Sequence, residues 1–228
     1  MQRPLRIEKL GCVAYGPAHE LQKARHRAVV EERCDDTLFL LEHPPVITTG
    51  KNTGDGNILV SRESLSEKGI ELFASGRGGD VTYHAPGQIV GYPILKLQDG
   101  EKDVRKYVWN LEEVLIRSAA DFGVVADRVE GLRGIWVGNY KLAAIGVRLS
   151  RWTTMHGFAI NVSTDLRGFD LIVPCGLEGR GVTSLEKLCG KVLPIQEVEK
   201  SLIRHLTTIF KREGYYSEPS ALVEGEEG

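Results

Sequence analysis

The sequence predicts a single α+β domain in which a mixed, largely antiparallel sheet is flanked by helices. Strand-like and helical segments follow one another in mixed order, which is typical of this fold class. The chain of 228 residues is long enough for one large core, and no repeat or linker divides it. The domain is expected over residues 1–215, and the acidic, glycine-rich residues 216–228 are expected to form a mobile tail.

The composition excludes several classes of protein. Apolar residues make up 42% and charged residues 26% of the chain, as in ordinary globular proteins. The net charge of −2 gives no global basic field that would attract nucleic acid. No apolar run approaches the ~18 residues of a membrane span, and residues 1–11 lack the apolar segment of a secretion signal. We therefore expect a cytoplasmic protein with reduced thiols and with neither a membrane nor a nucleic acid as partner.

Short apolar and β-branched runs predict the strands. Two prolines stop the run at 37–45, which indicates a buried strand. Pro86-Gly87 separates two strand-like pieces, and Gly138-Asn139 lies between two β-like runs as in a hairpin. Strands are expected within residues 5–14, 37–45, 46–51, 77–95, 134–149 and 155–163.

Two long segments carry apolar residues at helical spacing. In residues 102–123 they form one stripe, and Gly123 is expected to end the helix. The second helix is expected over residues 194–214, with Pro194 in its first turn and Gly214 at its end. Shorter helical patterns occupy residues 17–36 and 61–69.

The four cysteines differ in their surroundings. None belongs to a C-x-x-C pair and none faces a histidine pair, so no metal site is expected. Cys12 lies in a strand-like run and is expected in the core, whereas Cys34 and Cys189 end helical segments. Cys175 stands in the proline- and glycine-rich stretch 172–185, where a bend could present its thiol to a ligand. A loop cysteine without a partner is, however, more often inert.

Two further features have a functional and an ordinary interpretation. The stretch RGGDVTYHAPGQ, residues 77–88, has adjacent glycines that would let the backbone approach a ligand closely, or it is a glycine turn that enters a strand. Lys141 follows the predicted hairpin turn. It is either a solvated lysine on an edge strand or an ammonium group beside a thiol. The loop at 50–57 is not a phosphate-binding loop, because Pro45 stands where that motif needs glycine.

Three longer stretches resemble the lipoyl(octanoyl) transferase family, whose members move an octanoyl group from acyl carrier protein to a lysine of lipoyl domains. The stretches are RGGDVTYHAPGQIVGYPIL, GIWVGNYKLAAIGVRLSRWTTMHGFAINV and FDLIVPCGLEGRGVTSL. They follow the order of the family and cover most of residues 77 to 185. The resemblance implies the fold of the catalytic domains of biotin and lipoate protein ligases.

The resemblance also implies the site residues. It assigns a catalytic pair to Cys175 and Lys141, with a thioester intermediate on the cysteine and no cofactor. Asp80 is implied to be non-catalytic, because the family varies at this position. The implied acyl contacts are Arg77, Gly78, Gly79, Asp80, Val81, Thr82, Tyr83, His84, Ala144, Ile145, Gly146, Gly157, Phe158 and Ala159. The small residues Gly146, Gly157 and Ala159 are expected to leave room for the octanoyl chain.

The resemblance implies two protein partners. Octanoyl-acyl carrier protein would be the donor. The lipoyl domains of 2-oxoacid dehydrogenases and the glycine cleavage H protein would be the acceptors. The enzyme itself is expected to be a monomer. Because such partners tend to be acidic, a local basic surface is expected, although each of its candidates would also suit an ordinary solvated face. The candidates are Lys102, Arg105, Lys106, Arg148 and Arg151.

Two other functions fit parts of the sequence. An ATP-dependent lipoate-protein ligase would share the fold and keep a lysine, but it would need a nucleotide site and no cysteine. A non-catalytic acyl-binding protein would hold octanoyl groups without covalent capture. The presence of both Cys175 and Lys141 favours the transferase.

Overall fold

The computed structural model describes residues 2–54, 56–173 and 179–219. The helices are α1 (Tyr15–Val30), α2 (Arg62–Glu67), α3 (Val104–Ala120), η1 (Leu166–Leu171), α4 (Leu185–Cys189) and α5 (Ile195–Phe210). The strands are β1 (Arg3–Cys12), β2 (Asp36–Glu42), β3 (Val46–Thr49), β4 (Glu71–Ala74), β5 (Thr82–His84), β6 (Gln88–Ile94), β7 (Asp127–Val129), β8 (Leu132–Val137), β9 (Tyr140–Ser150), β10 (Thr153–Asn161), β11 (Gly181–Val182) and β12 (Arg212–Tyr216).

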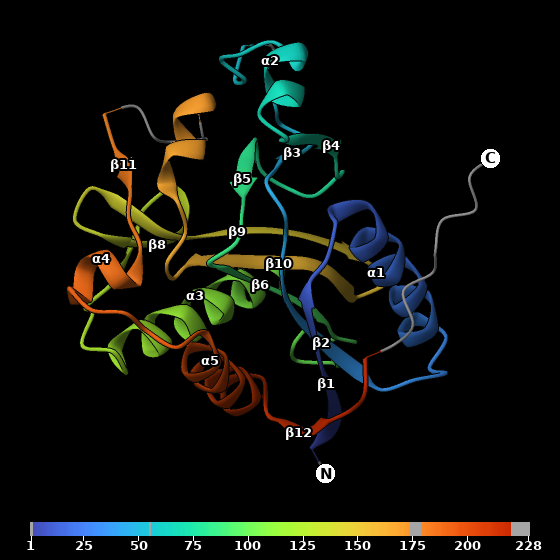
Figure 1. Cartoon of the computed structure of the whole chain (residues 1–228). Coiled ribbons are helices and arrows are strands. Elements are labelled where there is room, and N and C mark those ends of the chain that lie inside the picture. The colour runs from blue at the N-terminus through green and yellow to red at the C-terminus, as the bar shows by residue number, and fades with distance from the viewer. Residues whose placement is uncertain (1, 55, 174–178, 220–228) are drawn as a thin grey trace.

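A nine-stranded sheet forms the centre of the molecule (Figure 1). Its strand order is β12-β1-β2-β6-β10-β9-β8-β7, and β11 pairs with β9. The strand β1 is parallel to both of its neighbours and β11 is parallel to β9, whereas the other pairs are antiparallel. The prediction of a mixed, largely antiparallel sheet with flanking helices is confirmed.

Helices cover both faces of this sheet. The apolar stripes of α3 and α5 pack side by side on one face, where Leu111 and Leu202 are fully buried (Figure 1). The opposite face is covered by α1, through Ala18 and Leu21. None of the helices in the described ranges is long and apolar enough to span a bilayer.

A second, three-stranded sheet with the order β4-β3-β5 was not predicted. Its core includes Ile47, Leu65 and Val81, and it is separate from the two clusters that line the large sheet. The strand β4 is four residues long and only partly buried, so its sequence carries little hydrophobic pattern. This small sheet provides the support for one wall of the site described below.

Most of the predicted elements are confirmed, including both long helices and the hairpin at Gly138-Asn139. The second long helix was predicted to run through Gly214, and this is wrong. The helix ends at Phe210, Lys211 adopts the left-handed conformation with φ 51°, and Gly214 lies within β12. The prediction that Cys12 lies in the core is also wrong, because β1 leaves the core at that end and Cys12 is exposed. Residues 220–228 of the predicted tail lie outside the described residues.

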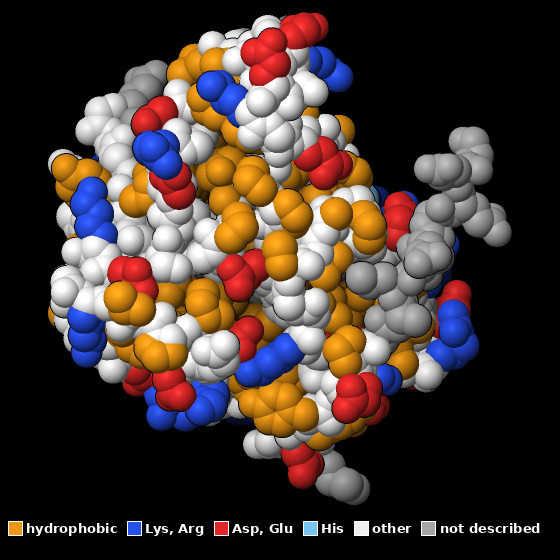
Figure 2. Space-filling model, viewed as in Figure 1, with side chains coloured by type: hydrophobic (Ala, Val, Ile, Leu, Met, Phe, Trp, Pro, Cys, Tyr) orange, Lys and Arg blue, Asp and Glu red, His pale blue; other side chains and the backbone are white. Residues whose placement is uncertain are grey.

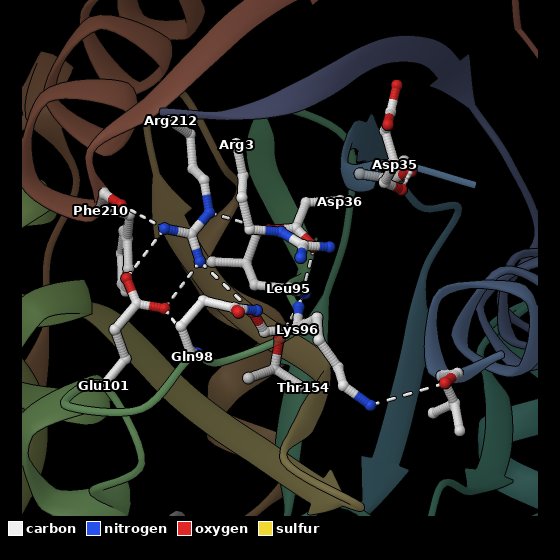
Figure 3. Close-up of polar contacts among 12 residues, drawn as sticks. Arg3, Asp35, Asp36, Leu95, Lys96, Gln98, Glu101, Thr154, Phe210 and Arg212 are labelled. Carbon is white, nitrogen blue, oxygen red and sulfur yellow. Dashed lines mark hydrogen bonds and ion pairs between the residues drawn. The ribbon is translucent and has the colours of Figure 1, made fainter. Parts of the chain in front are cut away.

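A buried ion-pair network explains why the chain turns into β12 (Figure 3). The Arg212 guanidinium donates to Asp36 Oδ2 at 2.8 Å, and to both carboxylate oxygens of Glu101 at 2.8 and 2.9 Å. The second oxygen of Asp36 accepts from the Lys96 backbone N–H at 2.9 Å. Since Arg212 and Asp36 are nearly inaccessible to solvent, these bonds fix β12 beside β1.

Candidate active site

A cavity of about 300 Å³ lies between the large sheet and the small one. Its floor is made by β6, β9 and β10, and its roof by residues 77–84, which lead into β5. Figure 2 shows hydrophobic side chains gathered over the middle of the same face as in Figure 1, while Lys and Arg lie mostly toward its edge. The apolar part of the lining includes Val81, Val90, Ala144, Ile145, Phe158 and Ala159.

All of the predicted acyl-contact residues except Tyr83 line this cavity. The Tyr83 ring packs in the core of the small sheet, 5.6 Å from the Phe169 ring in an edge-on arrangement. A Cβ atom on Gly168 would lie 2.2 Å from this ring, so glycine is required there. The structure therefore places Tyr83 behind the roof, where it supports the residues that face the cavity.

The structure gives Gly146 and Gly157 a different role from the one predicted. A Cβ atom on Gly146 would meet Arg77 Cδ and Gly78 O, both at 3.0 Å, and one on Gly157 would lie 2.1 Å from Gly91 O. These glycines thus allow the protein's own backbone to approach closely, instead of leaving open space for a ligand. Gly146 lets the roof lie directly on the floor at this end of the cavity, and Gly157 lets β10 pack closely against β6 within the floor.

Arg77 is buried in the roof and is held by backbone and hydroxyl oxygens. Its guanidinium donates to Thr48 O at 2.8 Å, to Thr48 Oγ1 at 3.0 Å and to Gly78 O at 3.2 Å. Burial lowers the pKa of Arg77, and the neighbouring Tyr15, Tyr92 and Asp80 oppose this shift. The side chain therefore shapes the cavity wall and positions the roof loop.

The loop that carries Arg77 is fixed on both sides. The Gly78 N–H donates to Val147 O on the floor at 3.0 Å, and Asn52 N donates to Gly79 O at 3.1 Å. Asp80 accepts from its neighbour's N–H, Val81 N, and from Asn57 Nδ2, both at 2.7 Å. Asp80 is therefore a clamp for the loop.

A directed chain of hydrogen bonds, the amide relay, runs from the small sheet to the cavity floor. It consists of Thr48, His84, Gln88, Asn161 and Thr183. The His84 Nδ1–H donates to Gln88 Oε1 at 2.7 Å, and Gln88 Nε2 donates to Asn161 Oδ1 at 2.9 Å. Asn161 Nδ2 then donates to Thr183 O at 3.0 Å, while a long contact of 3.5 Å joins Thr48 Oγ1 to His84 Nε2.

The direction of the relay follows from the charge state of His84. Burial lowers the pKa of His84 to about 3, so the ring is neutral at pH 7 and carries one proton. Since Nδ1 donates to the amide oxygen of Gln88, Nε2 is the acceptor and receives the Thr48 hydroxyl. Each amide group along the relay therefore has a single orientation, and the relay ends on the backbone of Thr183.

Lys141 lies near the Thr183 end of the cavity. It is half-buried on β9 and is flanked by Trp136 of β8 and Val182 of β11, so β9 is not an edge strand at this position. The Thr183 N–H donates to Lys141 O at 3.0 Å. The ammonium nitrogen lies 4.8 Å from the centroid of the Trp136 ring, which partly removes it from water. The interpretation of Lys141 as a solvated edge lysine is therefore wrong.

Cys175, the other member of the predicted pair, lies outside the described residues. Both flanks of its segment are nevertheless attached to the site. Val173 N donates to Asn57 O at 2.9 Å, and Gly181 N donates to Asn139 O at 3.1 Å beside Lys141. The free cysteines within the described ranges are Cys12, Cys34 and Cys189, and none of them lines the cavity.

The opposite end of the cavity carries polar rings that the sequence did not reveal. Tyr15, Tyr92 and His156 line it, and His156 stacks on His19 with ring centroids 5.5 Å apart. His43 lies behind them, donates from Nδ1 to a backbone oxygen at 2.6 Å and accepts from the Tyr92 hydroxyl at 2.8 Å. Histidines inside apolar runs were the available signal, but a single sequence does not show that they converge.

The predicted basic residues divide into two groups. Arg148 and Arg151 border a second cavity of about 430 Å³, together with Lys23 and Arg27 of α1. Lys102 instead pairs with the exposed Asp99 at 2.6 Å. Within the described parts of the chain, no three His, Cys, Asp or Glu side chains are grouped so that they could hold a metal ion.

Comparisons with known proteins agree with this geometry. The family model of the lipoyl protein ligase A/B catalytic domain matches residues 14–207. An octanoyltransferase from Caldicellulosiruptor saccharolyticus is 47% identical over 208 residues, which cover 90% of this chain and 88% of the relative. The bipartite lipoate protein ligase from Thermoplasma acidophilum shares the fold with a TM-score of 0.77 at 18% identity, covering 96% of this chain and 88% of that structure.

The likeness to biotin protein ligases is weaker and concerns the fold alone. The enzyme from Aquifex aeolicus, in complex with biotin and ATP, has a TM-score of 0.50 at 12% identity, with 91% of this chain and 70% of that structure covered. The octanoyltransferase match covers 90% of this chain at 47% identity, so the chain is more closely related to octanoyltransferases than to biotin protein ligases. The chain belongs to the octanoyltransferase family, within the lipoyl protein ligase A/B catalytic domain family.

Proposed function

We propose that this protein transfers an octanoyl group from octanoyl-acyl carrier protein to a lysine of lipoyl domains, through a thioester on Cys175 and with Lys141 as its catalytic partner. The acceptors would be the lipoyl domains of 2-oxoacid dehydrogenases and the glycine cleavage H protein, and the enzyme would act as a cytoplasmic monomer. The observation that carries the proposal is an apolar cavity that begins beside Lys141 in a chain of this family.

In the first step, the Cys175 thiolate attacks the carbonyl carbon of the donor thioester. A new C–S bond forms and the C–S bond to the carrier breaks. The carrier thiolate takes up the proton of the Lys141 ammonium group, which leaves Lys141 as a neutral amine. A free thiol has a pKa near ~8.5, so little of it is ionised at pH 7. An ammonium group at ~4 Å contributes roughly 4 kcal/mol at an effective dielectric constant of ~20, which favours the thiolate.

In the second step, the amine of the acceptor lysine attacks the Cys175 thioester. The C–N bond forms, the C–S bond breaks, and Cys175 returns as the thiolate. Lys141, in its neutral form, accepts the proton that the attacking amine loses and becomes the ammonium that stabilises this thiolate. Because one thioester is exchanged for another before the amide forms, the scheme needs no ATP.

The cavity walls supply the binding energy for the acyl chain. Val90 and Ala159 are buried and apolar, and they are paired on the same face of the floor. Burial of the six or seven methylene-type carbons of an octanoyl group, at ~0.8 kcal/mol each, contributes roughly 5 kcal/mol. A chain of this length is therefore recognised mainly by its apolar tail.

The proposal is tested by intact mass spectrometry. The purified protein is mixed with octanoyl-acyl carrier protein in the absence of ATP, and we expect one added octanoyl group that a lipoyl domain then removes. The Cys175→Ala variant should show no adduct, and the matched Cys189→Ala variant should load normally, because Cys189 does not line the cavity.

The opposite result would point to the ligases that share this fold. If an adduct or a modified lipoyl domain appears only when ATP and free octanoate are supplied, the transferase scheme is wrong. If Cys175→Ala loads as well as the unaltered protein, the thioester step is wrong.

A further inference from the structure

The strand register divides the cavity floor into layers. Asn161 is opposite Gln88, and Ala159 is opposite Val90 and Ala144, so each set shares one level of the sheet. Tyr92 follows Val90 by two residues and faces the same side, as their common cluster shows. An apolar layer thus lies between the amide relay at the Lys141 end and the tyrosine at the other end.

The spacing of these layers matches an acyl chain of medium length. Gln88 and Tyr92 are four residues apart on β6, which corresponds to about 13 Å along the strand. An extended octanoyl group measures about 9 Å from its carbonyl carbon to its methyl carbon, and van der Waals radii at both ends add to this length. With its carbonyl at the relay, the chain would end at Tyr92.

The far end of the cavity is closed by polar groups. His156 is 1% exposed, adopts a left-handed backbone conformation with φ 60°, and has no hydrogen-bond partner at either ring nitrogen. The Tyr92 hydroxyl donates to the His43 ring, as described above, so this end of the cavity holds a further polar group. Arg77 closes the roof here, because its side chain lies directly on Gly146.

The unusual conformation of His156 places its ring at this point. A regular strand would alternate its side chains between the two faces, and the left-handed residue breaks this alternation. His156 therefore stacks on His19 of α1, on the same side of the sheet as Tyr92. Few non-glycine residues adopt this conformation, and here it turns an unsatisfied imidazole toward the side of the sheet on which the cavity lies.

We propose that Tyr15, Tyr92 and His156 form a polar stop that sets the chain length of the acyl group at about eight carbons. This inference rests on the proposed function. A methylene group beyond the apolar layer would enter a site whose buried nitrogens need hydrogen bonds. It would therefore not tighten binding of the acyl chain by the roughly fourfold factor that an added buried methylene normally gives. The same stop would accept a polar atom at the tip of the chain.

Two donors with acyl groups of equal length distinguish a polar stop from an apolar wall at the end of the cavity. Nonanoyl and 8-hydroxyoctanoyl groups have the same number of heavy atoms and differ only at the tip. We expect kcat/KM for 8-hydroxyoctanoyl-carrier protein to equal or exceed the value for the nonanoyl donor. In an apolar tunnel, the hydroxyl group would reduce kcat/KM by about 10-fold or more.

The variant His156→Asn tests the residue itself. Asparagine tolerates the left-handed conformation, and its smaller side chain opens the end of the cavity. We expect the ratio of kcat/KM for octanoyl to that for decanoyl donors to fall by about 10-fold. The matched variant His26→Asn should keep the ratio, because His26 borders the second cavity.

The outcomes distinguish this inference from the proposed function. A preference for nonanoyl over 8-hydroxyoctanoyl in the unaltered protein, or an unchanged chain-length ratio in a His156→Asn protein that still loads octanoyl, overturns the polar stop alone. If the unaltered protein loads none of these groups onto Cys175, the proposed function fails as well. If His156→Asn does not fold, the comparison of the two isosteric donors decides the question.

Discussion

Asn161 connects the floor of the cavity to the strand beside Lys141. Its amide nitrogen donates to Thr183 O, and Thr183 N donates in turn to Lys141 O. Asn161 is 4% exposed and accepts from Gln88 on its other side, so its orientation is fixed. It is therefore a positioning residue that acts on Lys141 through β11.

Replacing this amide by a carboxylate should slow the enzyme without unfolding it. In Asn161→Asp, the group that donates to Thr183 O becomes an acceptor and the two oxygens repel each other. We expect the rate of octanoyl loading to fall by about 10- to 100-fold and its pH optimum to shift upward, because β11 no longer holds its place beside Lys141.

Single-turnover loading followed by mass spectrometry, from pH 6 to 9, measures this effect. The matched Asn110→Asp variant on α3 should load normally. An Asn161→Asp protein with normal rate and pH profile would show that the amide has no positioning role.

At this scale the sequence predicted residues that belong to continuous motifs. Lys141 and the roof residues from Arg77 to His84 were assigned through the resemblance, because they stand in continuous stretches of the sequence, and all of them except Tyr83 line the cavity. Tyr15 and His156 were not predicted, since they reach the cavity from α1 and β10 and share no sequence pattern. Their convergence depends on the left-handed turn at His156, which no local propensity indicates.

Among the elements, β12 is tied to two distant parts of the chain by a single side chain. Arg212 is the first residue of the strand, and its guanidinium joins Asp36 at the start of β2 to Glu101 before α3 (Figure 3). Asp36 is completely buried. Removing the arginine would leave this carboxylate without its main counter-charge.

Arg212→Met should lower the free energy of unfolding by about 3–5 kcal/mol, since a buried carboxylate is left unpaired. Urea unfolding at pH 7 measures the change. Arg204→Met is the matched control. Arg204 is exposed and pairs with Asp121 at the surface, so its loss should cost about 1 kcal/mol or less. Equal effects of the two substitutions would contradict the role given to the buried network.

The elements that the sequence predicted are those with a full hydrophobic pattern. The long helices α3 and α5 have buried stripes, and β2 and β10 are buried along nearly their whole length. The elements missed, among them β4 and β12, are short or exposed along most of their residues. The ion pairs of Arg212 hold β12 in place. Because such pairs leave no hydrophobic pattern in the sequence, β12 could not be predicted from one.

Over the whole molecule, three histidines are buried in the uncharged form. Burial lowers the pKa of His43 to about 4 and that of both His84 and His156 to about 3, from an ordinary value of 6.5. The unfolded chain therefore binds more protons than the folded one below pH 6.5. The stability that these groups contribute is complete above pH 6.5 and is lost as the pH falls toward 4 and then 3.

The free energy of unfolding should therefore fall by about 1 to 2 kcal/mol per histidine between pH 7 and pH 5. Urea unfolding across this range gives the number of protons taken up, which should approach three. In His156→Asn the slope of stability against pH should decrease by about one third. A stability that is constant from pH 7 to pH 5 would show that these rings are not buried in the neutral form.

The fold class of the whole chain followed from the order of its elements, but the division into two sheets did not. Strands β3 and β5 are only four and three residues long and carry no pattern that would assign them to a separate sheet. They separate because Arg77, Thr48 and the glycines of the roof loop hold them above the cavity. Tertiary contacts, which lie far apart in sequence, decide this arrangement.

The parallel pairing of β1 with β12 has a consequence for the synthesis of the chain. Arg3 pairs with Arg212, so β1 leaves the ribosome about 200 residues before its partner strand β12 is made. At about 5–20 residues per second, the intervening ~200 residues take roughly 10–40 seconds to make. During that time β1 can pair with β2 only, and its other side presents unsatisfied N–H and C=O groups. In the nascent chain this edge is where a chaperone, or a strand from another molecule, would find backbone groups to bind.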